Sequence, residues 1–262
     1  MKRILLAALC LAAFHGTARA ADASLQKVKA KGQLVLGLDD AFPPMGFRDE
    51  DNQIVGYDID LAQEVAKRIG VKLVPQPIDW NAKEQEINTG KIDCIWNGFT
   101  ITEERKQALL FTKPYLRNAQ VVVVKKGSPY TTLASLKAKK IGLQAGSSAA
   151  QALEAAKEFR ASLKEVVEFK DNLTALMDLE RGGVDGVVMD LIVANDNIKR
   201  SGKPYLVLQE TLAPEVFGVG FRKNDVALRD AVQGALDAMA KDGTLAKLTT
   251  KWFGSDISVV GK

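Results

Sequence analysis

The chain has 262 residues, 47% of them hydrophobic and 26% charged, and this ordinary globular usage excludes a disordered or collagen-like protein. The formal net charge is +4, from 36 basic and 32 acidic residues. This length fits one large domain or two smaller ones.

The first segment has the pattern of a secretory signal peptide. Lys2 and Arg3 precede an apolar run at 4–14, and the small-residue sequence Ala-Arg-Ala follows at 18–20. A membrane anchor needs about 20 apolar residues, roughly twice the length of this run. We therefore predict a signal peptide at residues 1–20 that is cleaved after Ala20.

Removal of this segment limits the chemistry of the mature chain. Three basic residues leave, so 33 remain against 32 acidic ones and the charge gives no reason to expect nucleic-acid binding. His15 and Cys10 also leave, which excludes histidine-dependent catalysis, histidine-bearing zinc sites and an intramolecular disulfide. We expect no metal and no cofactor, and Cys94 in an apolar run is predicted to be buried. A lipoprotein acylated at Cys10 is the alternative, although the preceding Leu9 is bulky for such a site.

Beyond the signal peptide, short apolar runs alternate with amphipathic windows. The pattern predicts a helix over 57–69, with acidic residues in its first turn and Gly70 at its end, and another helix over 226–240. This alternation is typical of an α/β protein with mostly parallel sheets flanked by helices. The predicted strands are 34–38, 71–74, 92–96, 121–124, 141–143, 166–169 and 186–189.

The number of strands favours two lobes over one sheet. About eight strands would make an unusually wide sheet. A polar, turn-rich break at 125–129 indicates a first crossing near 121–125, and a second candidate lies near 214–218. We predict a first lobe of residues 21–121 and 216–262, and a second lobe of residues 122–215.

Polar residues that follow the strands are the functional candidates, since ligands of such sheets bind beyond the carboxyl ends of the strands. Arg105 and the helix start Gly146-Ser147-Ser148 offer a guanidinium fork and backbone N–H groups, which suit an α-carboxylate. Asp190 offers a separate anion for an α-ammonium group. Phe42 and Trp80 can enclose the remainder of such a ligand. The combination predicts a site for a zwitterion.

Each candidate also has a purely structural interpretation. Thr100 and Glu103 fit a capping box, while Gly146-Ser147-Ser148 and Asp190 fit ordinary helix caps. Arg105 taken alone is typical of a surface charge. Only the conjunction of these residues favours a binding site.

A set of motifs runs through the mature chain. These are GLDDAFPPM at 37–45, GYDIDLA at 56–62, TITEER at 100–105, FTKPY at 111–115, GSS at 146–148, GVD at 183–185 with Asp190, DGT at 242–244 and KWF at 251–253. Their content and order resemble the periplasmic polar-amino-acid-binding proteins of ABC importers, solute-binding protein family 3. The resemblance implies the two-lobed type II periplasmic-binding-protein fold, with a mostly parallel sheet flanked by helices in each lobe.

The resemblance also implies a role for each site residue. Arg105 pairs with the ligand carboxylate, which also accepts from the helix start, where the family's Gly-Thr-Thr reads Gly-Ser-Ser here. Asp190 accepts from the ammonium group with help from the Thr100 hydroxyl and the Gly98 carbonyl. The predicted ligand-binding residues are Asp39, Phe42, Trp80, Gly98, Thr100, Arg105, Ser147, Ser148 and Asp190, with Trp96, Asn97 and Gln144 as possible lining residues.

The function that follows from the resemblance is capture of a free polar or basic L-amino acid by a periplasmic monomer. Closure of the lobes then signals an ABC permease in the inner membrane. Members that bind basic ligands often have a first-lobe disulfide that this chain cannot form, whereas Asp39 and Asp40 disfavour an acidic ligand. Neutral polar and basic ligands therefore rank equally. A cyclohexadienyl-dehydratase-like enzyme on the same scaffold and a ligand-sensing module are the alternatives.

Overall fold

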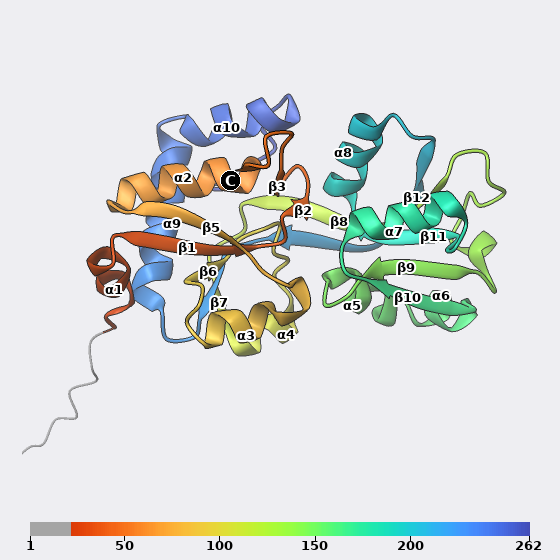
Figure 1. The fold of residues 1–262 in the computed structure, drawn as a ribbon, viewed down its shortest axis with the longest axis horizontal. Coiled ribbons are helices and arrows are strands. Elements are labelled where there is room, and N and C mark those ends of the chain that lie inside the picture. The colour runs from red at the N-terminus through yellow and green to blue at the C-terminus, as the bar shows by residue number, and fades with distance from the viewer. Residues whose placement is uncertain (1–21) are drawn as a thin grey trace, which may run out of the picture.

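The computed structural model describes residues 22–262, which form two lobes side by side (Figure 1). The predicted signal peptide at 1–20 and its cleavage site lie outside the described residues. Within residues 22–262, no helix has both the length and the apolar character needed to cross a membrane.

The first lobe is built on a five-stranded sheet. In spatial order its strands are β5 (Lys72–Pro77), β1 (Gln33–Leu38), β6 (Cys94–Ile95), β13 (Gly220–Arg222) and β7 (Leu109–Phe111). A small antiparallel sheet, β2 (Ala41–Phe42), β3 (Gly46–Arg48) and β4 (Ile54–Val55), follows the end of β1. The helices are α1 (Ser24–Ala30), α2 (Tyr57–Ile69), α3 (Lys83–Asn88), α4 (Glu103–Ala108), α9 (Val226–Lys241) and α10 (Thr244–Phe253), with a 3₁₀ turn η1 (Trp80–Ala82).

The second lobe also has a five-stranded sheet. Its strands are, in spatial order, β10 (Glu165–Phe169), β9 (Lys140–Gln144), β11 (Gly186–Asp190), β8 (Leu116–Lys125) and β12 (Tyr205–Phe217). The helices α7 (Asn172–Arg181) and α8 (Leu191–Ser201) lie on one side of this sheet, and α5 (Ser148–Ala155) and α6 (Lys157–Ser162) on the other (Figure 1). A 3₁₀ turn, η2 (Ala134–Leu136), precedes β9.

Apolar runs explain why the central strands form where they do. In β1, Leu34, Leu36 and Leu38 are completely buried, and every residue of 121–124 in β8 is buried as well. Helices cover both faces of each sheet, so a central strand needs an almost continuous apolar run rather than alternation. Helix α2 occupies 57–69 as predicted and ends at Gly70, which adopts a left-handed φ of 81°. Cys94 is buried, as predicted.

Both sheets are mixed, which corrects the prediction of mostly parallel sheets. Strand β1 pairs in parallel with β5 and β6, and β9 in parallel with β10 and β11, but β13 is antiparallel to β6 and β7. Strand β8 is antiparallel to β11 and β12. The reason is topological: β8 leaves the first lobe and β12 returns to it, so the two run in opposite directions when they pair.

Strands β8 and β12 themselves connect the lobes. Leu116 pairs with Phe217 at their first-lobe end, and beyond it Thr112 N donates to the carbonyl of Val219 (3.0 Å). Residues 121–125, where the sequence predicted the first crossing, therefore lie inside the second sheet. The turn after them ends β8 far from the first lobe, because turn residues mark the end of a strand and not a change of lobe. The predicted crossing at 214–218 covers the end of β12.

Candidate functional site

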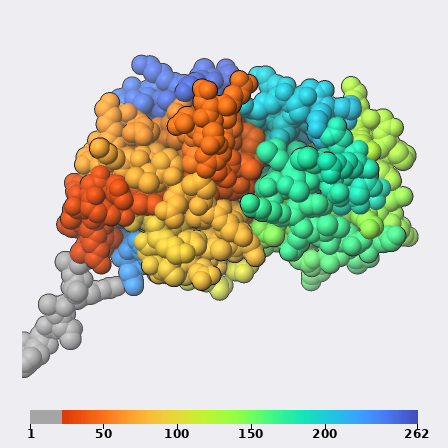
Figure 2. All heavy atoms as spheres, viewed as in Figure 1, coloured from red at the N-terminus to blue at the C-terminus, as the bar shows by residue number. Residues whose placement is uncertain are grey.

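The two lobes touch along one boundary (Figure 2), and predicted residues of both lobes contact each other in the cleft there. Gln144 Nε2 in the second lobe donates to Asp39 Oδ2 in the first lobe (2.7 Å). The hydroxyl oxygens of Thr100 and Ser148, also from opposite lobes, lie 3.1 Å apart. Polar side chains of both lobes thus line one narrow space.

Helix α4 begins at Glu103, and its cap differs from the expected one. The hydroxyl of Thr102 accepts from Arg105 N (3.1 Å), so Thr102 is the N-cap. The capping-box interpretation of Thr100 and Glu103 is therefore wrong by two residues. Since Thr102 satisfies the helix start, the Thr100 hydroxyl is directed to the cleft instead, where it contacts Ser148.

Arg105 is 4% exposed and reaches from α4 in the first lobe to the second lobe. Its guanidinium donates to the carbonyls of Thr100 (2.9 Å) and of Gly146 in the second lobe (3.3 Å), and it lies 4.4 Å from the Phe99 ring centroid. Burial lowers the pKa of Arg105 to about 10. Both hydrogen bonds go to carbonyl oxygens, so within residues 22–262 no carboxylate forms an ion pair with it. A buried cation in this state can accept an anionic ligand group.

Lys83 is a second buried cation at the same place, and its role was not predicted from the sequence. Its Nζ donates to the carbonyls of Gly146 (2.8 Å) and Trp80 (3.2 Å), and it lies 5.4 Å from the Trp80 ring centroid. Burial and the nearby charge of Arg105 lower the pKa of Lys83 to about 8. Lys83 is the first residue of α3, where nothing in the sequence separates it from a surface lysine.

The start of α5 lies opposite these two cations. Ser147 is the N-cap, but its hydroxyl donates to the carbonyl of Gln144 (2.7 Å) and does not cap the helix. The Ser148 hydroxyl is 3.2 Å from Gln120 Nε2. The first-turn N–H groups of α5 therefore have no side-chain cap, which leaves the positive end of the helix directed at the cleft.

Asp190 ends β11 and precedes α8, and it is 4% exposed. Its side chain makes no capping bond to α8; instead Asn118 Nδ2 donates to Asp190 Oδ1 (2.6 Å). Burial, reinforced by the negative charge of Glu215, raises the pKa of Asp190, while Arg105 acts in the opposite direction. Asp190 thus occupies the N-cap position of α8, as the cap interpretation predicted, but its carboxylate does not cap the helix and is held in the cleft.

Asp39 and Trp80 of the first lobe border a cavity that also contacts the second lobe. Asp39 Oδ1 accepts from Ala41 N (2.9 Å), and burial raises the pKa of Asp39 to about 6. Trp80 packs edge-on against Phe99, with ring centroids 5.7 Å apart. A cavity of about 320 Å³ is lined by Asp39 and Trp80 from the first lobe and by Lys170 from the second, among others.

The loop of Gly98 and Thr100 is held by the carboxylate of Asp58, whose predicted place was only the first turn of α2. Asp58 is completely buried, and its Oδ2 accepts from Gly98 N (2.7 Å) and from the Tyr115 hydroxyl (2.9 Å). Burial raises the pKa of Asp58 to about 7. Asp58 therefore fixes the backbone that carries two of the predicted ligand contacts.

Neighbours of that loop explain where Phe42 and Trp96 lie. Gly98 has a φ of 56°, and a Cβ there would lie 2.9 Å from the Phe42 ring, so this close approach requires glycine. Asn97 Oδ1 accepts from Asp39 N (3.1 Å), which ties the loop to the end of β1. Trp96 is completely buried within the first-lobe core, which places it behind the cleft residues.

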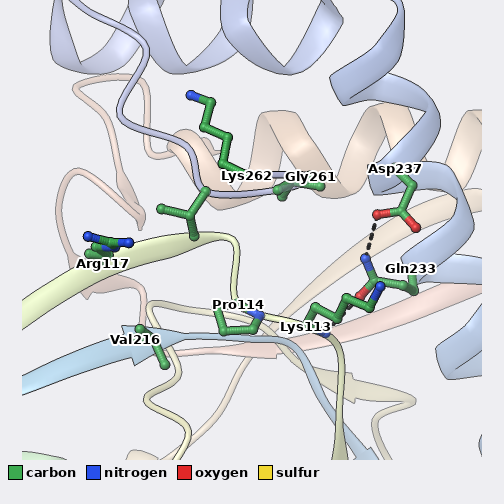
Figure 3. Close-up of a pocket in the computed structure, with 10 residues that line it drawn as sticks. Lys113, Pro114, Arg117, Val216, Gln233, Asp237, Gly261 and Lys262 are labelled. Atoms are coloured by element: carbon green, nitrogen blue, oxygen red, sulfur yellow. Dashed lines mark hydrogen bonds between the residues drawn. The ribbon is translucent and has the colours of Figure 1, made fainter.

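A different hollow, of about 360 Å³, lies beside the connecting strands (Figure 3). Lys113, Pro114, Arg117 and Val216 line it together with residues of α9 and of the C-terminal segment, and none of the predicted site residues takes part. Among the described residues, no three histidine, cysteine or acidic side chains are grouped to hold a metal ion.

The buried carboxylates predict a pH-dependent stability. Asp39, Asp58 and Asp190 have raised pKa values in the folded protein, so between about pH 4 and 7 they bind more protons there than in the unfolded chain. The free energy of unfolding should therefore fall as the pH rises through this range. We expect the melting temperature of the ligand-free protein to fall by several degrees, measured by circular dichroism from pH 4.5 to 7.5. Asp39→Asn should flatten this slope and the exposed Asp51→Asn should not; a melting temperature that rises over the range would contradict the prediction.

Comparison with known proteins adds independent information. Residues 34–255 match the model of a family described as bacterial extracellular solute-binding proteins, family 3. The L-cystine-binding protein TcyJ of Escherichia coli strain K12 is 33% identical over 238 residues, which cover 89% of this chain and 87% of that protein.

Solved structures agree with this match. A substrate-binding protein of an ABC uptake transporter from Streptococcus pneumoniae, with bound histidine, has a TM-score of 0.88 and 36% identity, covering 91% of this chain and 99% of that one. The protein Tv2483 bound to L-arginine has the same TM-score and identity over 92% of this chain and 98% of its own. The type II two-lobed fold predicted from the sequence is thus confirmed.

Proposed function

The chain belongs to the bacterial extracellular solute-binding proteins of family 3, and on that premise we propose that it captures a free polar or basic L-amino acid in the cleft and delivers it to an ABC permease of the inner membrane. The relative TcyJ is an L-cystine-binding protein by name, and the solved neighbours hold histidine and arginine. We place the protein in the periplasm as a monomer, exported by a signal peptide cleaved after Ala20.

The observation that carries this proposal is the opposition of two buried charges across the cleft. Arg105 belongs to the first lobe, Asp190 to the second, and each influences the pKa of the other. An α-carboxylate on Arg105 and the start of α5, with an α-ammonium group on Asp190, satisfies both charges with one small molecule. We assign Thr100 and Gly98 to the same ammonium group.

Closure follows from this arrangement. An amino acid that contacts Arg105 in one lobe and Asp190 in the other stabilises the closed form through interactions that an open form lacks. A micromolar dissociation constant corresponds to about −8 kcal/mol, which a few desolvated charge-assisted hydrogen bonds and enclosure by Phe42 and Trp80 can supply. No chemical step is required, and we propose that the protein is not an enzyme.

A thermal-shift screen tests the function directly. The twenty L-amino acids and L-cystine are added separately at 1 mM to the protein without its signal peptide. A ligand present at 100 times its dissociation constant adds about 2.7 kcal/mol to the free energy of unfolding. A melting temperature that none of these compounds raises would exclude amino-acid capture, and loss of prephenate or arogenate on incubation would instead reveal a dehydratase.

The ligand class gives a separate prediction. We assign Asp39 and Trp80 to the side-chain end of the ligand, where the Asp39 carboxyl is buried beside Gln144. An acidic ligand side chain there would be desolvated against like charge, whereas a neutral amide or a cation can pair with Asp39. In competition against a fluorescent tracer, we expect glutamine, arginine, histidine or lysine to displace it at least tenfold better than glutamate or aspartate. Better displacement by glutamate or aspartate would refute the assignment of Asp39 to the side-chain end of the ligand.

A further inference from the structure

Glu215 is an acidic residue of the cleft that no part of the proposed function uses. It lies near the end of β12, one of the two strands that connect the lobes. Its Oε2 accepts from Gln120 Nε2 (2.9 Å), Asn118 Nδ2 (3.1 Å) and the Thr100 hydroxyl (3.1 Å). These donors come from both lobes, so the Glu215 carboxylate lies at the floor of the cleft.

Glu215 and Asp190 form a pair of carboxylates around one amide group. Asn118 Nδ2 donates to Asp190 Oδ1 at 2.6 Å and to Glu215 Oε2 at 3.1 Å. Among residues 22–262, no lysine or arginine lies within ion-pair distance of either carboxylate; the nearby Arg105 donates to carbonyl oxygens instead. Two acidic groups that share one donor repel each other: the Glu215 charge raises the pKa of Asp190, while the nearby Arg105 charge acts in the opposite direction without forming an ion pair. A cation between the two carboxylates relieves that repulsion.

We propose that Glu215 is the second acceptor of the ligand's α-ammonium group, beside Asp190. The inference rests on the proposed function, since it needs an amino acid in the cleft. An ammonium group has three N–H donors, which the geometry distributes over Asp190, Glu215 and the Thr100 hydroxyl, so that Glu215 replaces the Gly98 carbonyl as the third acceptor. Asp39 is bonded to Gln144 and serves the opposite, side-chain end of the ligand. Glu215 therefore recognises the part that all amino acids share.

This role makes Glu215 a determinant of specificity for the amino group. A 2-hydroxy acid keeps the carboxylate but brings a neutral hydroxyl, which leaves both acidic groups without a counter-ion. The protein should therefore reject 2-hydroxy acids strongly, and the degree of rejection should depend on Glu215 as well as on Asp190.

Glu215→Gln tests the inference, with the exposed Glu168→Gln of the same lobe as the matched control. The probes are the twenty L-amino acids and L-cystine, with dissociation constants measured by calorimetry. We expect Glu215→Gln to raise the dissociation constant of every amino acid that the wild type binds by tenfold or more. The factor should be similar for all of them, whatever the ligand side chain. The preference of the protein for an amino acid over the corresponding 2-hydroxy acid should shrink by a comparable factor. Glu168→Gln should change neither the affinity nor this preference.

A pH titration gives a readout that a merely structural role would not move. The groups that act on Asp190 are the charges of Glu215 on β12 and Arg105 on α4, and the amides of Asn118 and Gln120 on β8. Loss of the Glu215 charge removes one cause of the raised pKa of Asp190. The rise of affinity with pH should therefore move to lower pH in Glu215→Gln, and Glu215→Asp should keep part of the wild-type profile.

The possible outcomes separate this inference from the proposed function. If the wild type binds none of the probes, the function itself is refuted, and the inference with it. If the wild type binds and Glu215→Gln binds equally well, only the inference is refuted. A loss confined to arginine, lysine and histidine would also overturn it, because it would assign Glu215 to the ligand side chain.

Discussion

Arg105→Ala should weaken amino-acid binding by about 2 to 5 kcal/mol, which is roughly thirtyfold to several thousandfold in the dissociation constant. Within residues 22–262 the buried guanidinium donates to carbonyl oxygens and forms no ion pair with a carboxylate, so the ligand carboxylate is the partner that completes its charge. Its loss leaves that carboxylate desolvated beside the partly compensating Lys83. Isothermal titration calorimetry with the strongest ligand of the thermal-shift screen measures the effect.

Arg105→Lys should cost nearly as much, since an ammonium point charge cannot reproduce two parallel hydrogen bonds to a carboxylate. Arg181→Lys is the matched control, because Arg181 is an exposed residue at the end of α7. Wild-type affinity in Arg105→Lys would show that the guanidinium fork is not the carboxylate anchor, even if Arg105→Ala were inactive through loss of packing on Phe99.

Segments with a regular hydrophobic pattern could be predicted from the sequence, and segments with an irregular pattern could not. Residues 57–69 have an amphipathic period and a terminal glycine, and α2 occupies that range. Residues 205–217 form β12, but its apolar run covers only 205–208, the rest is partly exposed and irregular, and its pairing with β8 shifts register between Val207 and Ala213. Short strands such as β7 and β13 depend on tertiary partners rather than on their own composition.

Residues of the candidate site could be predicted where a residue follows a strand and also belongs to a family motif. Arg105, Thr100 and Asp190 have both signals, and all three are buried at the cleft. Asp58 occupies a helix first turn, where an acid is locally favourable in any protein, so its burial under Gly98 could not be inferred from the chain. Glu215 lies inside a strand whose partners are remote in sequence, and only the pairing of β12 with β8 brings it to the floor of the cleft.

Asp190→Asn should lower amino-acid affinity by about 2 to 4 kcal/mol while it preserves the fold. The amide oxygen can still accept from Asn118, so the local hydrogen bond survives, but the negative charge opposite the ligand ammonium is lost. Without ligand, the variant should be at least as stable as the wild type, because it no longer repels the Glu215 carboxylate. Thermal melting without ligand and calorimetry with ligand separate the two effects, and Asp51→Asn serves as the exposed control.

The pH dependence of binding tests the pairing of Asp190 with the ligand ammonium group more specifically than an affinity at one pH does. In the ligand-free protein, burial and Glu215 raise the pKa of Asp190, whereas a bound ammonium group lowers it. Binding should then release a proton near that pKa, so wild-type affinity should rise with pH through this range and reach a plateau above it. Asp190→Asn should remove most of this rise. If that variant bound amino acids with undiminished affinity and an unchanged pH profile, the ammonium group would have to be held elsewhere in the cleft.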